Sequence, residues 1–193
     1  DTYGVDRWNF LVETNGSWTF ARDTDTPTGI GTYSLKATNV TLDNQCAIVQ
    51  IIENVNARKF ASGLANLSFY AKTNSTEIAN LRATVLSWSS TADTVTSDVI
   101  SAWASDGTDP TFAANWTKEV AGSNLALTST WTKYEIEQIL IDTASMTNLA
   151  VVIWVDDGTI AANDDFYITG VQLNYGVVTS AYAPQSFEQE LQA

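Results

Sequence analysis

A set of side chains in the alternating segments of this sequence combines large aromatic rings with charged planar groups. Tyr70, Arg82, Trp88, Glu135 and Trp154 all have the opposite parity to the apolar residues of their own segments, so we expect them to point away from the core. An aromatic ring stacks on the apolar side of a sugar, and guanidinium or carboxylate groups bond its hydroxyls. The pattern therefore predicts a glycan-binding face made by these residues.

Two other interpretations of this face remain open. A subunit interface is also enriched in Trp, Tyr and Arg. Alternatively, the long polar segment 89–129, which contains Trp103, Phe112 and Trp116, covers the tryptophans of this face. A segment of that length carries either a function or short elements of its own.

Catalysis is disfavoured by the residues that are absent. The chain has no histidine, which excludes histidine-dependent nucleophiles and histidine-ligated metals. Glu135 and Glu137 share one face of a predicted strand, whereas a glycosidase needs two carboxylates about 5 to 10 Å apart across a cleft. No acid from another segment is identified as a partner, so we expect a protein without catalytic residues.

We also expect no metal and no cofactor. The pairs Asp156-Asp157 and Asp164-Asp165 could offer oxygen ligands to calcium, but neither has the spacing of an EF-hand loop. Paired aspartates are common in ordinary turns. The single cysteine, Cys46, lies in an apolar run and is expected to be a small buried core residue.

The charge of the chain argues against two classes of partner. There are 22 acidic and 9 basic residues, a net charge of -13, and the basic residues are scattered along the sequence. Such a surface repels a phosphate backbone and an anionic lipid headgroup. We therefore expect no nucleic-acid partner and no membrane partner.

Alternating and β-branched segments dominate the chain and predict an all-β protein. The predicted strands are 8–12, 18–22, 33–38, 46–52, 67–72, 81–88, 132–140, 149–155 and 166–173, with one short helical stretch at 56–63. Gly170 in the last strand indicates a bulge or a close backbone approach. The expected fold is a jelly-roll β-sandwich of about nine or ten antiparallel strands with a short C-terminal helical tail.

The expected domain organisation is one β-sandwich over residues 1–180 and a tail over 181–193. Ser186 and Gln189 have capping-box spacing, and Phe187 and Leu191 are four apart on one helical face, which predicts a short helix in the tail. The chain begins at Asp1 and its only methionine is Met146, so we expect a processed N-terminus or a piece of a longer chain.

Three stretches carry a resemblance to a known family. The chain resembles the C-terminal jelly-roll domains of phage tail fibres and related virion appendages. The resemblance is carried by the closing segments 166–176 (FYITGVQLNYG) and 179–184 (TSAYAP), by the tail 186–191 (SFEQEL), and by the strands 61–72 (ASGLANLSFYAK) and 129–134 (STWTKY). Those domains are similar to carbohydrate-binding-module sandwiches. The modules commonly hold a structural calcium at a position that matches 169–170 here, where no carboxylate stands.

This resemblance implies a non-enzymatic, structural domain of a phage fibre or appendage that attaches to glycans on the host surface. It implies a location in the virion, self-association as a homotrimer, and contacts with other virion proteins. Two alternatives are a carbohydrate-binding module of a polysaccharide-degrading enzyme and a capsid-decorating protein without a ligand.

Overall fold

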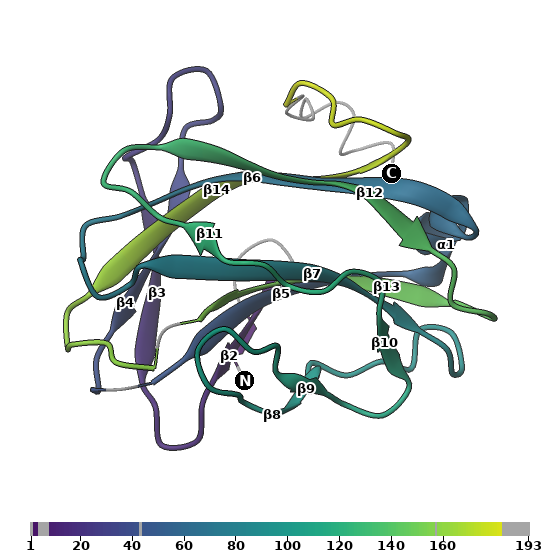
Figure 1. Cartoon of the computed structure of the whole chain (residues 1–193), viewed down its shortest axis with the longest axis horizontal. Coiled ribbons are helices and arrows are strands. Elements are labelled where there is room, and N and C mark those ends of the chain that lie inside the picture. Colours follow the sequence, from purple (N-terminus) through teal and green to yellow (C-terminus); the bar gives the residue numbers. More distant parts are fainter. Residues whose placement is uncertain (1, 4–7, 43, 157, 183–193) are drawn as a thin grey trace.

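The computed structural model describes residues 2–3, 8–42, 44–156 and 158–182. Two antiparallel sheets lie face to face and form the two main layers of the molecule (Figure 1). This is the expected all-β sandwich of the jelly-roll type.

Sheet A is built on the apolar strand β13, which is buried along its whole length. Its order is β1 (Thr2–Tyr3), β2 (Trp8–Val12), β5 (Cys46–Ile52), β13 (Asn148–Val155), β7 (Asn80–Trp88) and β10 (Trp116–Lys118), and β11 (Leu125–Ala126) also pairs with β7. Apolar residues follow one another in β13 because both of its faces are covered, as in a central strand between two packed layers.

Sheet B is the second layer. Its order is β12 (Thr132–Ile141), β6 (Gly63–Thr73), β14 (Asp165–Tyr175), β4 (Ser34–Asn39) and β3 (Trp18–Asp23). A separate pair joins β8 (Ile100–Ala102) to β9 (Thr111–Phe112), and the short helices α1 (Asn54–Ala57) and η2 (Arg58–Phe60) follow β5. Each segment predicted as a strand is a strand here, and the short helical stretch is found at 54–60 rather than 56–63.

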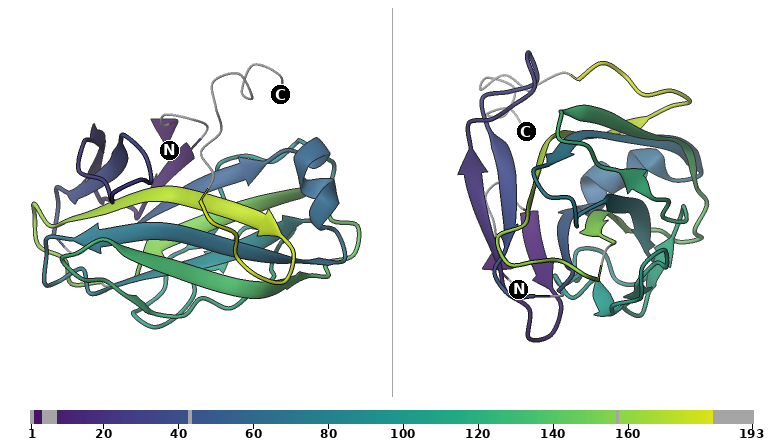
Figure 2. Two further views of the ribbon diagram at one scale, coloured as in Figure 1. Left: turned by 90° about the horizontal axis from the view of Figure 1, so that it is seen from above. Right: turned by 60° about the vertical axis from the view of Figure 1, so that its left-hand side comes forward.

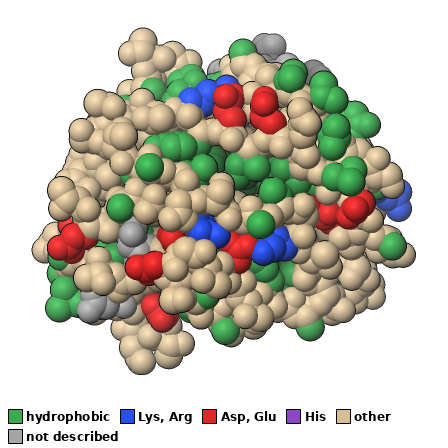
Figure 3. Space-filling view, in the orientation of Figure 1, with side chains coloured by type: hydrophobic (Ala, Val, Ile, Leu, Met, Phe, Trp, Pro, Cys, Tyr) green, Lys and Arg blue, Asp and Glu red, His purple; other side chains and the backbone are tan. Residues whose placement is uncertain are grey.

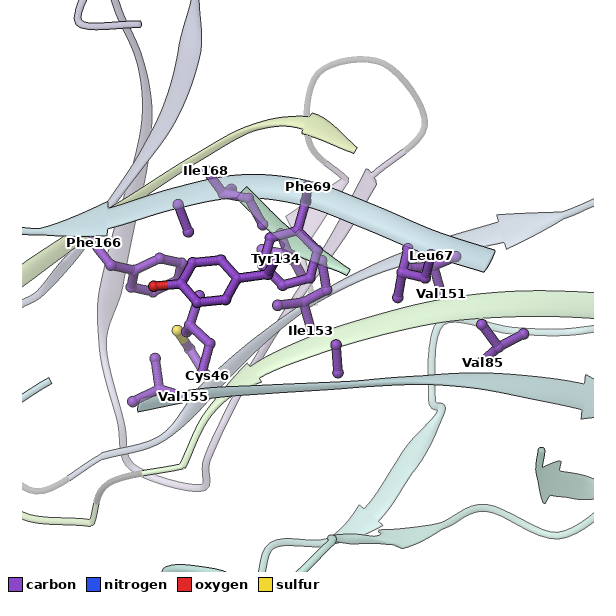
Figure 4. Close-up of a cluster of buried hydrophobic side chains, with 14 of the residues drawn as sticks. Cys46, Leu67, Phe69, Val85, Tyr134, Val151, Ile153, Val155, Phe166 and Ile168 are labelled. Atoms are coloured by element: carbon purple, nitrogen blue, oxygen red, sulfur yellow. The ribbon is translucent and has the colours of Figure 1, made fainter. Parts of the chain in front are cut away.

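The core lies between the sheets, where the alternation of each strand points its apolar residues inward (Figure 4). The apolar residues of the alternating segments, which the sequence places on the inward face, are found in it. Buried there are Leu67, Phe69, Ala71, Leu81, Ala83, Val85, Tyr134, Val151, Ile153 and Val155, and Ile136 packs against them. Cys46 is also buried in this core, and burial raises the pKa of its thiol. The thiolate, which is the reactive form, is therefore disfavoured.

A second apolar cluster lies on the other side of sheet A. It joins Leu86, Val152 and Trp154 of the sheet to Val99 and Trp116 of the segment 89–129, which we call the excursion. Strands β8 and β9 of the excursion lie on the side of sheet A away from sheet B, while β10 pairs with β7 at the edge of sheet A (Figure 1). The excursion thus forms a partial third layer with short strands of its own, as its length predicted.

Residues 183–193, with the predicted helix around Phe187 and Leu191, lie outside the described residues. The expected boundary between the sandwich and the tail at residue 180 stays a prediction. No helix within the described ranges is long and apolar enough to cross a membrane.

Candidate functional site

The residues predicted to form one glycan-binding face belong to two opposite faces of the sandwich. Tyr70 lies on β6 and Glu135 on β12, both in sheet B, whereas Arg82, Trp88 and Trp154 lie in sheet A. Their parity away from the central core was predicted correctly. Alternation tells which face of its own sheet a residue occupies, but not which sheet it joins, so the single face was a wrong inference.

Trp154 is buried rather than exposed, which corrects the expected open ring. Its side chain is 1% exposed. A Cβ atom built on Gly122 of the excursion would lie 2.7 Å from the Cη2 atom of this ring, so the backbone at Gly122 rests on the indole. The alternative in which the excursion covers the tryptophans is the one that the structure shows.

Arg82 is paired with Trp154 across β7 and β13 and is also buried, at 6% exposure. Its guanidinium donates to the Oδ1 atoms of Asn124 (2.5 Å) and Asp109 (2.9 Å) and to the carbonyl of Gly122 (2.6 Å). These partners all belong to the excursion. Arg82 therefore fixes the excursion to sheet A through both terminal nitrogens of its guanidinium, and the whole side chain is buried away from solvent.

The carboxylates around Arg82 have pKa values shifted in opposite directions. Burial raises the pKa of Asp109, but hydrogen bonds from Lys118, Arg82 and the Gly122 N–H outweigh this and leave it below its ordinary value. Burial raises the pKa of Asp156, and this effect exceeds the opposing hydrogen bond from the Gly107 N–H. Asp156 lies 3.6 Å from the Nε atom of Arg82, too far for a good hydrogen bond.

Trp88 is half-buried at the end of β7. Its ring packs against that of Trp116, with centroids 5.1 Å apart, and its indole N–H donates to the carbonyl of Thr91 at 3.2 Å. Trp88 thus belongs to the second apolar cluster.

Glu135 and Tyr70 lie on the outer face of sheet B, where the chain that follows β14 returns. Glu135 accepts hydrogen bonds from Lys133 (2.6 Å) and from the hydroxyl of Thr179, while Glu137 accepts from the N–H of Thr179 (3.0 Å). The bonds from Lys133 and then from Thr179 lower the pKa of Glu135. Both carboxylates therefore hold the segment 176–182 on the sheet, which is seen above β12 and β6 in Figure 1.

A second group on this outer face combines aromatic rings with ammonium groups. Lys72 lies 2.5 Å from the Oδ2 atom of Asp25 and 4.7 Å from the ring centroid of Tyr167, and the Trp131 indole N–H donates to Asp25 at 2.9 Å. The bonds from Lys72 and Trp131 lower the pKa of Asp25. This group holds the loop after β3 on the sheet. Its polar side chains form hydrogen bonds and an ion pair with one another.

The described residues surround a cleft of about 470 Å³ between the sheets, where β2 and β5 face β3 and β4. This is within the size range of ligand pockets, about 300 to 1,000 Å³. Figure 2 (right) shows the first of these strands, β2 and β3 in purple, at one side of the sandwich. The wall of the cleft is made by Trp8, Phe10, Arg22, Tyr33, Ser34, Leu35, Ile48, Gln50, Ile168, Thr169, Gly170, Val171 and Tyr182.

The cleft begins where the aromatic core ends. Phe10 of β2 stacks on Phe20 of β3, with ring centroids 4.0 Å apart and planes inclined by 4°, and this pair closes the space between the sheets. The next inward positions along the same strands are Trp8, which pairs with Gln50, and Arg22, which pairs with Leu35. Arg22 and Gln50 stand where alternation calls for apolar residues, so the space between them stays open.

A bulge in β14 builds the remaining wall. The pairing of β14 with β6 shifts register between Thr169 and Gln172, and Gly170 has a φ of +61°. A Cβ atom on Gly170 would lie 2.7 Å from Cγ2 of Ile30, so the loop after β3 approaches this backbone closely. Both features predicted from this glycine, a bulge and a close approach, are confirmed.

Arg22 is the charged residue of the cleft wall. Its guanidinium carbon lies 4.2 Å from the ring centroid of Tyr33, which is 46% exposed, and Thr169 donates to the Tyr33 carbonyl at 2.9 Å. Within the described part of the chain, no hydrogen bond uses the Arg22 guanidinium, the Gln50 amide or the Trp8 indole N–H. These donors therefore line the cleft without a hydrogen-bond partner among the described residues.

Sequence reasoning missed the cleft, although it left a signal. In the strand 18–22, Trp18 and Phe20 point inward and Arg22 follows at the same parity; in 46–52, Gln50 interrupts an apolar run. A polar residue at an inward position near a strand end marks a place where the core stops.

The aspartate pairs considered for calcium have structural partners. Asp164 accepts a hydrogen bond from the Ala161 N–H at 2.9 Å, and Asp165 pairs with Lys36 at 3.0 Å. The Tyr167 hydroxyl and then Asp165 raise the pKa of Lys36. Among the residues that the structure describes, no three Asp, Glu or Cys side chains gather as a metal site; Asp157 lies outside them.

Comparison with known proteins identifies the fold. No family model matches the sequence, and no curated protein is significantly similar to it. The structure is similar to the enzymatically active domain of tailspike protein 4 of bacteriophage CBA120, with a TM-score of 0.55, 14% identity, and coverage of 90% of this chain and 20% of that one.

Two further solved structures are carbohydrate-binding modules. One belongs to the β-sandwich superfamily of modules with promiscuous specificity (TM-score 0.57, 11% identity, coverage 89% and 58%). The other is a family 11 module from Clostridium thermocellum in complex with a mixed-linked tetrasaccharide (TM-score 0.51, 13% identity, coverage 88% and 89%). The chain thus spans much less than the full length of the first two proteins, and what it shares with all three is the β-sandwich fold of these modules.

Proposed function

We propose that this chain is a non-catalytic glycan-binding domain whose ligand enters the cleft between β2, β5, β3 and β4. The observation that carries the proposal is the cleft wall. In it the partly exposed rings of Trp8 and Tyr33 stand beside the polar groups of Arg22 and Gln50, which no described residue binds. The similarity to carbohydrate-binding modules supports the fold on which such a cleft is built.

The chemistry of the wall suits a sugar. A pyranose ring has an apolar side that stacks on an aromatic face and a rim of hydroxyls that need directional partners. Tyr33 and Trp8 supply rings, and Arg22 and Gln50 supply hydrogen-bonding groups within the same cleft. Trp8, Arg22 and Gln50 lie on paired strands and Tyr33 directly precedes β4, so the backbone that carries them is fixed before binding.

We place the domain in the distal part of a phage tail or head fibre, in the virion, where it attaches to glycans of the host surface as a homotrimer alongside other virion proteins. The closing motif 166–184 and the similarity to a tailspike domain support this setting.

A second candidate is a carbohydrate-binding module attached to a polysaccharide-degrading enzyme. It is favoured by the similarity to the N-terminal CBM22-1 and GH10 modules of a Clostridium thermocellum xylanase complexed with xylohexaose (TM-score 0.52, 15% identity, coverage 93% and 28%). In both settings the ligand is a glycan and the site is the same cleft.

Truncation of Tyr33 tests the cleft. Tyr33→Ala removes an exposed ring, and loss of a central aromatic anchor costs about 2 kcal/mol or more of binding, which exceeds one decade in Kd. We expect at least about tenfold weaker binding to the glycan that wild type selects from an array, measured by calorimetry in solution. Tyr175→Ala, which removes a 61% exposed ring outside the cleft, is the matched control and should bind as wild type. Equal binding by all three proteins would contradict the proposed site.

A further inference from the structure

The charge of the cleft differs in sign from that of the whole molecule. The chain carries a net charge of -13, yet the cleft wall contains one arginine and no carboxylate among its described residues. Arg22 also has no ion pair with any described residue. By contrast, Lys36, Lys72, Arg82, Lys118 and Lys133 are each paired with an acid. Arg22 thus brings to the cleft a positive charge that no described carboxylate pairs with, whereas Arg58 and Lys59, which also lack a described ion pair, lie in η2 outside the cleft wall.

Two side chains of the cleft wall, the Arg22 guanidinium and the Trp8 indole, carry only hydrogen-bond donors. Gln50 and the hydroxyls of the wall can both donate and accept. The groups that both donate and accept suit the hydroxyls of any sugar. The positive charge of Arg22, with no carboxylate among the described residues of the wall, favours a ligand that also carries a negative charge.

The guanidinium is also held in an orientation that favours a planar partner. It lies over the Tyr33 ring at 4.2 Å, which restricts its side-chain rotation while leaving the edge of the fork open. A guanidinium presents two parallel N–H donors that match the two oxygens of a carboxylate. The exposed ring of Tyr33 beside it offers a surface for the sugar that carries this group.

We propose that the glycan recognised by the cleft is acidic, and that Arg22 binds the carboxylate of a uronic acid or sialic acid residue. This inference rests on the proposed function, because it assigns the ligand class of the same site. The protein as a whole repels polyanions, so we expect a local contact to one sugar carboxylate rather than binding to any anionic polymer.

The test uses pairs of glycans that differ in the carboxylate alone. Oligogalacturonate is compared with the carboxyl-reduced oligosaccharide of the same length and linkage, and sialyllactose with lactose, within an array that also holds neutral plant and bacterial glycans. We expect the intact chain to bind the acidic member of at least one pair ten or more times more tightly than its neutral counterpart. The pair that shows the difference identifies the source of the carboxylate.

Variants at Arg22 then assign the contact. Arg22→Gln should abolish the preference for the acidic member, and Arg22→Lys should restore only part of it, because an ammonium lacks the planar fork. Arg58→Gln removes an exposed arginine from η2, outside the cleft wall, and should bind as wild type. Circular dichroism of each variant confirms folding.

The outcomes separate the two proposals. Binding to neutral glycans through the cleft, with Tyr33→Ala still weakening it, overturns the acidic ligand and leaves the proposed function standing. A preference for the acidic member that survives in Arg22→Gln overturns the role of Arg22. Failure to bind any glycan on the array overturns both.

Discussion

Gly122, a residue without a side chain, lets the backbone of the excursion lie directly on the ring of Trp154. The same glycine offers its carbonyl to Arg82, so one residue connects the apolar and the polar contacts that hold the excursion in place. At the residue scale, Trp154 is thus a packing residue between two layers.

Trp154→Ala should therefore destabilise the fold. The ring is 1% exposed and belongs to the second apolar cluster, and replacing a buried Trp or Phe with Ala typically costs about 3 to 5 kcal/mol. We expect a fall of that order in the free energy of unfolding, measured by urea titration at neutral pH. Trp131→Ala, which removes a half-exposed indole from the outer face of sheet B, is the control and should cost clearly less. If Trp154→Ala lowers the free energy of unfolding by no more than the control does, the packing role assigned to Trp154 is wrong.

Much at this scale could be predicted from the sequence. Period-two alternation predicted the inward face of each strand, including Val151, Ile153 and Val155 in β13, and Gly170 predicted the bulge in β14. Two features could not be predicted from the sequence. Sheet membership depends on long-range pairing that alternation does not encode, which is why Tyr70 and Trp154 were wrongly placed together. The cover over Trp154 depends on the path of the excursion, a segment with little periodic pattern.

At the scale of elements, the excursion is joined to sheet A at its edge and on its outer face. β10 and β11 both pair with β7, while the side chains of Asp109 and Asn124 reach Arg82 from loops on either side of β10. The apolar cluster and this polar group together explain why a polar segment of such length remains ordered. Pairing at the edge also protects β7 from association with other chains.

Asp109 makes the attachment of the excursion sensitive to acid. Its pKa is lower in the folded protein than its ordinary value, so its contribution to stability is fully present above the unfolded-state pKa, about 3.9, and is lost as the pH falls through the lower folded-state value. Asp156 has a raised pKa, and its protonation stabilises the folded state as the pH falls from that raised value toward the unfolded-state pKa. The two groups therefore act in opposite directions.

Asp109→Asn should lower stability at pH 7 and weaken its decline on acidification. The variant keeps the shape of the side chain but loses the negative charge between Arg82 and Lys118. We expect the difference in urea midpoint between wild type and variant to be large at pH 7 and to shrink at pH 3. Asp98→Asn, an exposed position in the same excursion, is the control and should show a small difference at both values. A constant difference for Asp109→Asn at both pH values would contradict the role of its charge.

At the scale of the whole molecule, charged and apolar side chains are distributed differently over the surface. On the side of the sandwich shown in Figure 3, where the edges of both sheets face the viewer, acidic and basic side chains lie side by side around a band of hydrophobic ones. Near the beginning of β6, however, Leu140, Val177 and Val178 are 49%, 60% and 64% exposed. Leu140 pairs with Leu64 of β6, and the N–H of Gly176, just before the two valines, donates to the carbonyl of the same Leu64. These apolar side chains thus lie around one end of sheet B, away from the cleft wall, and leave room for a contact with another copy of the chain.

Self-association as a trimer is the last prediction, and it depends on the tail. Phe187 and Leu191 are spaced to share one side of a helix, and a single short helix cannot bury such a side by itself. We expect sedimentation equilibrium of the full chain at micromolar concentration to give the mass of three copies. The double variant Phe187→Ser with Leu191→Ser should shift the mass toward one copy, whereas Glu188→Ser, which changes a neighbouring residue without removing an apolar one, should not. A full chain that sediments as a single copy, or a double variant that remains a trimer, would contradict this assembly; the latter result would direct attention to Leu140, Val177 and Val178 as the contact.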